Sequence, residues 1–284
     1  MIPAPAPASA PPPVTVTEPA VSRWLKQVWP HRGLTFALTR RDIEARYRGS
    51  FGGGLWTFLH PLLLMLTYYF VFGLVLQSRF PGDPSREGFV LYFLAGMLPW
   101  LSMSETWGRS PALIPEHATL IKKVIFPVEI LPLVRTLAAL VTQAAGLVIF
   151  LALLLITRGS IPSSALWLPV LIVPQLMLTL GVSYILAALG AFVRDLAQVM
   201  GFLLTLVFFL TPICYPDASL PAFALPVLGK NPVYVLVRGY RAVLLEGHAP
   251  EFAALWKLWL LSAVVLIAGR KWFHSLRRSF ADLL

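Results

Sequence analysis

The stretch RDIEARYRGSFGGGLWTFLHPLLLMLTYYFVFG, residues 41–73, changes abruptly from charged to apolar. Arginines and acids fill its first part, three glycines follow at 52–54, and no charged residue occurs from 55 to 78. A helix crosses the hydrocarbon core of a bilayer with about 20 apolar residues, each rising about 1.5 Å. We therefore expect the arginines to lie at headgroup level. The glycines would turn the chain into the membrane, where a spanning helix starts at His60-Pro61.

The composition extends this expectation to the whole chain. Hydrophobic residues make up 57% of it and charged residues 13%, with a mean hydropathy of +0.75. Soluble domains are about 25% charged, so the chain is predicted to be an all-α polytopic membrane protein. Six segments are long and apolar enough to cross. The predicted transmembrane domain covers 56–272, with spans at about 57–77, 88–107, 134–157, 167–191, 196–215 and 252–270.

The segments outside the six spans are assigned from their prolines and from the polarity of their residues. Residues 220–237 are apolar but interrupted by prolines, so we expect short re-entrant helices between spans five and six. Residues 1–20 are rich in proline and alanine and predict a disordered cytoplasmic tail rather than a signal peptide. An N-terminal amphipathic segment at 21–55 is expected to lie on the membrane surface, and 273–284 to form a second cytoplasmic tail.

Lysine and arginine set the predicted orientation. With six spans, 16 of the 23 basic residues fall on the side that carries both termini and 7 on the other. The positive-inside rule therefore places the N- and C-termini in the cytoplasm. Anchoring to anionic lipid explains the net charge of +10, so no nucleic-acid partner is expected.

Little of the sequence suggests catalysis or metal binding. Cys214 is the single cysteine, and the five histidines lie in different segments: His31, His60, His117, His248 and His274. We therefore expect no metal site and no catalytic residue. Glu105, at the end of the second predicted span, is the acid nearest a membrane interior, and we expect it to pair with Arg109.

Five stretches resemble one family of transport proteins. They are RDIEARYRGSFGGGLWTFLHPLL, LAGMLPWLSMSETW, LIKKVIFPVEILPLVRTLAALV, RDLAQV and LTPICYP followed by LPVLGKNPVYVLVRGYRAVLLEG. They are similar to the ABC-type polysaccharide and polyol-phosphate export permeases, the membrane subunits that export O-antigen, capsule and teichoic-acid chains. The resemblance implies a homodimer joined to two copies of an ATP-binding subunit. It also implies an undecaprenyl-pyrophosphate-linked glycan as the substrate.

The chain agrees with that division of labour. It contains no G-x-x-x-x-G-K-[ST] loop, so ATP and Mg would bind to the partner and no cofactor to this chain. In the family, a short helix between spans two and three docks on the ATPase. Here the corresponding residues are Glu116, His117, Leu120, Ile121, Lys122 and Lys123. Because a small loop has no core for Leu120 and Ile121, docking is favoured over a merely solvated loop.

Two further sets of residues are candidates for contact with a glycan. Tyr68, Tyr69, Phe72 and Trp100 offer flat apolar area for sugar rings along a channel, although packing or lipid contact would also explain them. Arg41, Arg46 and Arg48 offer forked donors for a lipid pyrophosphate, although anchoring to the inner leaflet predicts the same residues.

Two alternative functions stay open at this stage. A permease of the same fold that exports a drug or lipid would lack the LIKKVIFPVEILP loop. A membrane-embedded transferase would need converging acids, histidines or serines at one membrane face, and the predicted spans are almost free of ionisable groups. O-antigen is favoured as the cargo, with capsule and teichoic acid as the other two classes.

Overall fold

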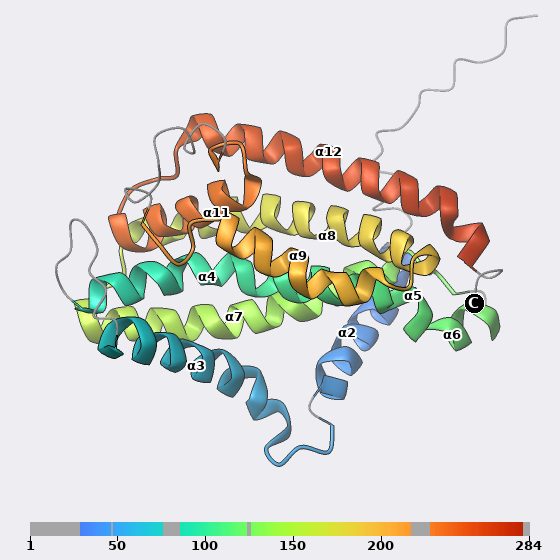
Figure 1. Ribbon diagram of the computed structural model, residues 1–284, viewed down its shortest axis with the longest axis horizontal. Coiled ribbons are helices and arrows are strands. Elements are labelled where there is room, and N and C mark those ends of the chain that lie inside the picture. Colours follow the sequence, from blue (N-terminus) through green and yellow to red (C-terminus); the bar gives the residue numbers. More distant parts are fainter. Residues whose placement is uncertain (1–28, 47, 76–85, 124–125, 217–227, 281–284) are drawn as a thin grey trace, which may run out of the picture.

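The computed structural model describes residues 29–46, 48–75, 86–123, 126–216 and 228–280 of the 284-residue chain. The predicted N-terminal tail and the first half of the predicted re-entrant segment lie outside these residues. The described part consists of helices and connecting turns, without a β-strand (Figure 1). The all-α class is therefore confirmed.

Long helices run side by side along the molecule and shorter ones lie at its two ends (Figure 1). The long ones are α3 (Trp56–Tyr68), α4 (Arg86–Arg109), α7 (Ile130–Arg158), α8 (Leu168–Phe192), α9 (Leu196–Leu210) and α12 (Phe252–Leu276). The others are α2 (Arg32–Arg46), which has as many residues as α9, and the short helices α5 (Leu113–Glu116), α6 (Ala118–Lys123) and α11 (Pro232–Arg241). Two π-helical segments, Tyr69–Val75 and Ala242–Glu246, extend α3 and α11.

Four helical segments in the described part are long and apolar enough to cross a membrane: Gly53–Val71, Ile130–Arg158, Ser163–Phe192 and Phe252–Ser279. They match predicted spans one, three, four and six. The second predicted span corresponds to α4, which carries Glu87, Glu105 and two arginines but is enclosed by other helices, so that 89–98 are almost all buried. The fifth corresponds to α9, which has only 15 residues. The count of six spans stays a prediction.

The glycine turn before α3 forms as predicted. Gly49, Gly52 and Gly53 have φ values of 82°, 111° and 47°, a region in which residues with a Cβ are strained. The start of α3 differs from the prediction, because the helix begins at Trp56 and Pro61 lies inside it. Pro61 therefore leaves the carbonyl of Thr57 without its usual helical partner.

Helices α8 and α12 approach closely through glycines. A Cβ on Gly181 would lie 2.7 Å from the backbone of α12 at Val265 and Leu266, and a Cβ on Gly269 would collide with the carbonyl of Gly181. Small residues allow such contact between helices in lipid, where dispersion replaces the hydrophobic effect.

At the end of the bundle opposite α2, a buried arginine connects several segments by hydrogen bonds. Arg241 of α11 is 2% exposed and donates to the carbonyls of Pro212, Ile213 and Tyr92 at 2.8, 2.9 and 3.1 Å. Its guanidinium lies 3.5 Å from the centroid of the Tyr92 ring. Arg241 thus joins α11 to α4 and to the turn after α9. Next to it, Gly96 leaves room that a Cβ would take, only 2.8 Å from Nη2 of Arg241.

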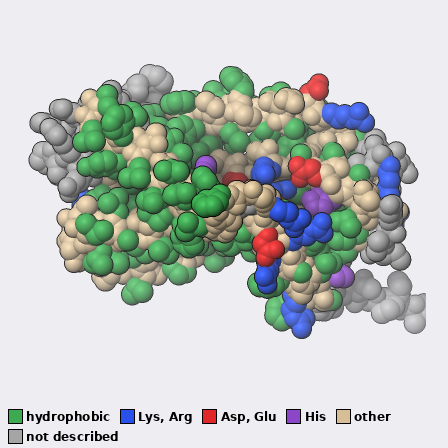
Figure 2. Space-filling view, turned by 90° about the horizontal axis from the view of Figure 1, so that it is seen from below, with side chains coloured by type: hydrophobic (Ala, Val, Ile, Leu, Met, Phe, Trp, Pro, Cys, Tyr) green, Lys and Arg blue, Asp and Glu red, His purple; other side chains and the backbone are tan. Residues whose placement is uncertain are grey.

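Charged side chains gather at the other end. Figure 2 shows Lys, Arg, Asp, Glu and His side chains clustered at one end of an otherwise largely apolar face. That end holds α2, α5, α6 and the last turns of α12 (Figure 1). The segments that the sequence assigns to the cytoplasm therefore come together in space.

Candidate functional site

A groove of about 610 Å³ borders α3, α4, α7 and α9. It brings together residues predicted for different roles. The lining includes Tyr68 and Trp100 toward one end and Arg46, His60, Glu105 and Arg109 toward the other. Predicted channel aromatics and predicted phosphate-binding arginines therefore meet in one groove, and its two ends differ in chemistry.

At the aromatic end of the groove, Tyr68 and Trp100 each pack against another aromatic ring. The ring of Tyr68 lies 4.5 Å from that of Phe93, and the ring of Trp100 lies 5.8 Å from that of Phe208. Trp100 is only 6% exposed, so its edge rather than its full face borders the groove. Tyr69 is 37% exposed and does not line it. The side chain of Phe72 lies outside the described part.

At the charged end, Arg46 is held by acids. It donates to Asp42 at 3.0 Å and to Thr142 at 3.3 Å, and it forms an ion pair with Glu105. Its side chain is 10% exposed. Glu105 thus pairs with Arg46 of α2, not with Arg109 as its position on α4 predicts. Sequence distance explains the difference, because the partner lies 59 residues upstream, in another helix.

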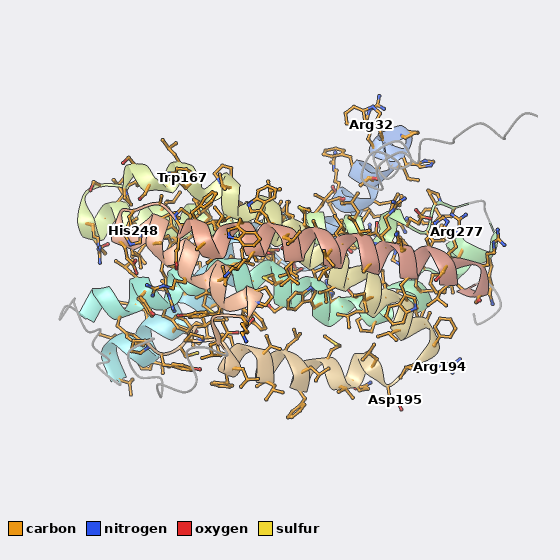
Figure 3. The ribbon with its side chains drawn as sticks, turned by 90° about the horizontal axis from the view of Figure 1, so that it is seen from above. Arg32, Trp167, Arg194, Asp195, His248 and Arg277 are labelled. Carbon is orange, nitrogen blue, oxygen red and sulfur yellow. The ribbon has the colours of Figure 1, made fainter. Side chains whose placement is uncertain are left out.

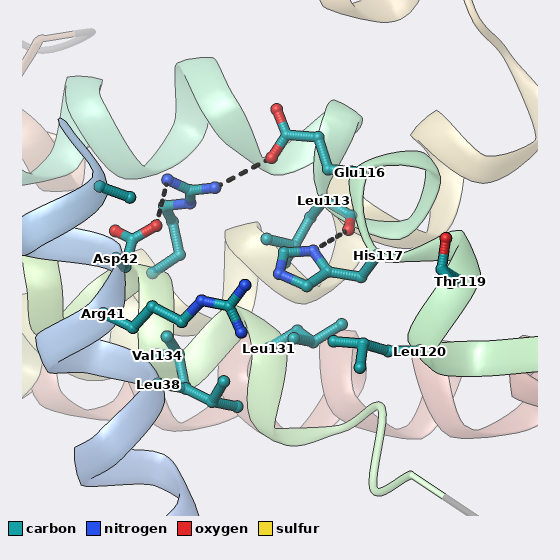
Figure 4. Close-up of a pocket in the computed structure, with 12 residues that line it drawn as sticks. Leu38, Arg41, Asp42, Leu113, Glu116, His117, Thr119, Leu120, Leu131 and Val134 are labelled. Carbon is teal, nitrogen blue, oxygen red and sulfur yellow. Dashed lines mark hydrogen bonds and ion pairs between the residues drawn. The ribbon is translucent and has the colours of Figure 1, made fainter. Parts of the chain in front are cut away.

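The ion pairs continue toward the loop between α4 and α7. Arg135 of α7 bridges Asp42 at 2.9 Å and Glu116 at 3.1 Å, and its side chain is 6% exposed. Figure 4 shows this bridge at the edge of a second cavity of about 500 Å³. Glu116, Arg135, Asp42, Arg46 and Glu105 therefore form a continuous series of charges, hereafter the ion series. It links α5, α7, α2 and α4.

The predicted docking helix is present but interrupted. α5 ends at Glu116, α6 begins at Ala118, and between them Nδ1 of His117 lies 2.8 Å from the Leu113 carbonyl oxygen. Leu120 borders the second cavity (Figure 4). Lys122 is exposed, and the side chain of Lys123 lies outside the described part.

Ile121 was expected to find no core within its own chain, but it does. It packs on a small buried cluster of the chain itself, hereafter the loop core: Leu113, Ile114, Leu131, Leu180, Tyr184, Ala187, Ala188, Phe273 and Phe280. The premise that this loop has no core is therefore wrong for Ile121. The core was missed because Phe273 and Phe280 come from the C-terminal segment.

Glu129 ties the loop to that segment. Its carboxylate lies 2.6 Å from Nδ1 of His274, 2.9 Å from Arg277 and 3.9 Å from Arg270. Its backbone carbonyl accepts a hydrogen bond of 2.8 Å from the Tyr184 hydroxyl. Figure 3 places Arg277 at the far end of α12. The loop that precedes α7 is thus anchored to the last turns of α12 by side-chain charges.

A buried polar cluster lies among the long helices. Gln143 donates to the Tyr240 hydroxyl at 2.8 Å, Gln175 donates to Ser102 at 2.9 Å, and Tyr240 donates to Gln175 at 2.7 Å. The four residues join α4, α7, α8 and α11. This cluster was not predicted from the sequence. Gln143 and Gln175 signal it, because lipid offers an amide inside an apolar span no hydrogen bonds.

The other predicted residues lie apart from the groove. Arg41 is exposed and borders the second cavity, while Arg48 is exposed in the glycine turn and lines neither cavity. Among the described residues, histidines, cysteine and acids form no group suited to a metal ion.

Comparison with known proteins gives this arrangement a family. The family described as "ABC-2 type transporter" matches residues 33–245. The chain is 35% identical over 267 residues to "O-antigen export system permease protein RfbA" of Myxococcus xanthus, which covers 92% of this chain and 98% of that protein. It is 28% identical over 254 residues to the protein of the same name from Klebsiella pneumoniae, covering 88% and 95%.

A further relative has a different cargo in its name. The chain is 25% identical over 236 residues to "Polysialic acid transport protein KpsM" of Escherichia coli, covering 82% of this chain and 89% of that protein. The family predicted from the sequence motifs is confirmed, and the chain belongs to the integral membrane proteins of the ABC-2 type transporter family.

Proposed function

We propose that this chain is the permease subunit of an ABC exporter that moves a lipid-linked polysaccharide, with O-antigen favoured, across the bacterial inner membrane. It acts as a homodimer with two copies of an ATP-binding subunit, and its termini face the cytoplasm. The observation that carries the proposal is similarity along almost the full length of an O-antigen export permease. Capsule-type export is the second candidate, because KpsM is also a relative.

The groove suits such a cargo. Its aromatic end, lined by Tyr68 and by only a small exposed part of Trp100, gives apolar area with a polar hydroxyl against which a sugar ring can lie. A series of shallow contacts allows a long glycan to slide, whereas one deep pocket would retain it. A drug exporter needs a more enclosed, mainly apolar pocket, and a transferase needs converging reactive groups. The groove differs from such a pocket in having a charged end, and Glu105 in its lining is held in an ion pair by Arg46.

The ion series supports coupling to ATP hydrolysis. It begins at Glu116 in the proposed docking loop and ends at Glu105 in the groove. A movement of α5 would act on Arg135, then on α2 through Asp42, and so on the charged end of the groove. The pairs of Arg46 and Arg135 with Asp42 are largely buried, whereas Glu116 is half exposed. Separating the buried pairs in low dielectric is unfavourable, so they would transmit such a displacement.

The division of labour predicts a simple activity pattern. Purified alone, the chain should show no ATP hydrolysis above background, because it has no phosphate-binding loop. With an ATP-binding subunit from the same gene cluster, hydrolysis should appear and surface glycan should be restored in a strain lacking the permease. Phosphate release and glycan immunoblotting measure both. ATP turnover by the lone chain at the rate of the complex would contradict the assignment.

Leu120 offers the sharpest test of docking. We expect Leu120→Asp to weaken co-purification of the ATP-binding subunit about 10- to 100-fold, since an apolar anchor of this size contributes about 1.5–3 kcal/mol. Leu120→Met keeps the apolar volume and should retain binding. Ile121→Ala should instead lower thermal stability, because Ile121 packs on the loop core. Undiminished binding by Leu120→Asp would show that the partner docks elsewhere.

A further inference from the structure

The charged end of the groove holds one arginine that is not committed to an acid. Arg46, which also borders the groove, is compensated by Asp42 and Glu105. Arg109 borders the same end and is exposed, and its side chain forms neither an ion pair nor a hydrogen bond with another residue of the described part. His60 also borders it and is exposed. The positive charge available to a ligand there comes from Arg109, with ring nitrogens of His60 as further partners.

The spacing between the cationic and aromatic ends follows from the two helices that carry them. Arg109 and Trp100 are nine residues apart on α4, about 13 Å at helical rise, and His60 and Tyr68 are eight apart on α3, about 12 Å. Both helices therefore place a basic residue at the cytoplasmic end and an aromatic residue deeper in the bundle. A ligand complementary to the groove has an anionic group at one end and apolar-faced rings at the other.

We propose that Arg109 and His60 form a binding site for the diphosphate of a lipid-linked glycan, with the first sugar rings lying toward Trp100 and Tyr68. The proposal rests on the proposed function and assigns its headgroup site. It replaces Arg46, which its two acids neutralise, and Arg48, which lies outside the groove. The arginine fork matches phosphate oxygens, and charge-assisted hydrogen bonds are about twice as strong as neutral ones.

Equilibrium binding of radiolabelled farnesyl pyrophosphate tests the site. The full complex with its ATP-binding subunit is used in phosphatidylcholine nanodiscs. We expect Arg109→Ala to weaken binding about tenfold or more and His60→Ala about threefold, as for the loss of one charged and one weaker donor. Both variants should keep the thermal stability of the parent, because neither side chain holds a described partner. Arg194→Ala, a change of an exposed arginine in the loop before α9, is the matched control and should bind like the parent (Figure 3).

Competition identifies the source of the phosphate. Unlabelled farnesyl pyrophosphate should displace the probe, while inorganic pyrophosphate and farnesol should do so far more weakly. Equal displacement by phosphatidylglycerol would overturn the proposal in favour of general lipid anchoring. So would parental binding by Arg109→Ala, or a loss confined to Arg48→Ala. If Arg109→Ala exports glycan and binds the probe like the parent, the proposed headgroup site is wrong but the proposed function stands. Absence of glycan export by the unaltered complex rejects the proposed function.

Discussion

Replacing Arg241 with methionine is expected to lower the free energy of unfolding by about 3–5 kcal/mol. The substitution keeps much of the side-chain volume but removes the donors to Pro212 and Ile213 at 2.8 and 2.9 Å. Both residues are buried, so no water replaces the lost hydrogen bonds. The contact with the Tyr92 ring is lost as well. Unfolding by SDS titration in mixed micelles measures the change.

Arg238→Met is the matched control for this experiment. Arg238 lies on the same helix one turn earlier but is exposed, and we expect its substitution to change stability much less. Equal losses for the two variants would show that the buried position of Arg241 is unimportant and that general charge at this end matters instead.

Replacing Arg135 with methionine is expected to cost about 3 kcal/mol and to remove ATP-driven export. Arg135 is 5% exposed and bridges Asp42 and Glu116. Without it, Glu116 loses its arginine in the ion series, and Asp42 keeps only Arg46, which it shares with Glu105. α2 and α5 then lose their common partner on α7. Export per inserted transporter and thermal stability should therefore fall together.

The comparison for Arg135 is an exposed ion pair on α2, the helix that Arg135 contacts through Asp42. The ion pair Arg40–Glu44 spans 2.7 Å, but its side chains are 72% and 54% exposed. Screening by water makes such pairs weak, so Arg40→Met should leave export and stability unchanged. If Arg135→Met exports like the parent, the ion series is not the route by which the loop acts on the groove.

The long apolar helices were predictable because lipid requires some 20 consecutive apolar residues, and this local rule needs no knowledge of the fold. The glycine turn was predictable for a similar reason, since positive φ selects glycine. Helix α4 does not follow the rule for apolar helices fully, because it carries charged residues at both ends. Its middle, residues 88–100, is buried by neighbouring helices, so those residues do not have to face lipid.

The pairing of charges was not predictable in the same way. Sequence proximity suggested Arg109 for Glu105, whereas the fold brings Arg46 to it. Arg241 was counted among the basic residues of the outer side, but α11 turns it inward to carbonyls contributed by α4 and by the turn after α9. Such contacts join residues far apart in the chain. They produce no local pattern in a single sequence, so they cannot be predicted from it.

The loop core has a consequence for the order of biosynthesis. Leu113, Ile114 and Leu131 pack with Phe273 and Phe280, which are synthesised about 150 residues later. The ion-pair partners of Glu129, His274 and Arg277, are likewise synthesised much later than Glu129. A nascent chain that has not released α12 from the ribosome therefore exposes an unsupported docking loop. If this loop docks the ATP-binding subunit, as proposed above, recruitment is deferred until translation is complete. A chain truncated before Phe273 would then insert its earlier helices yet present no finished docking surface.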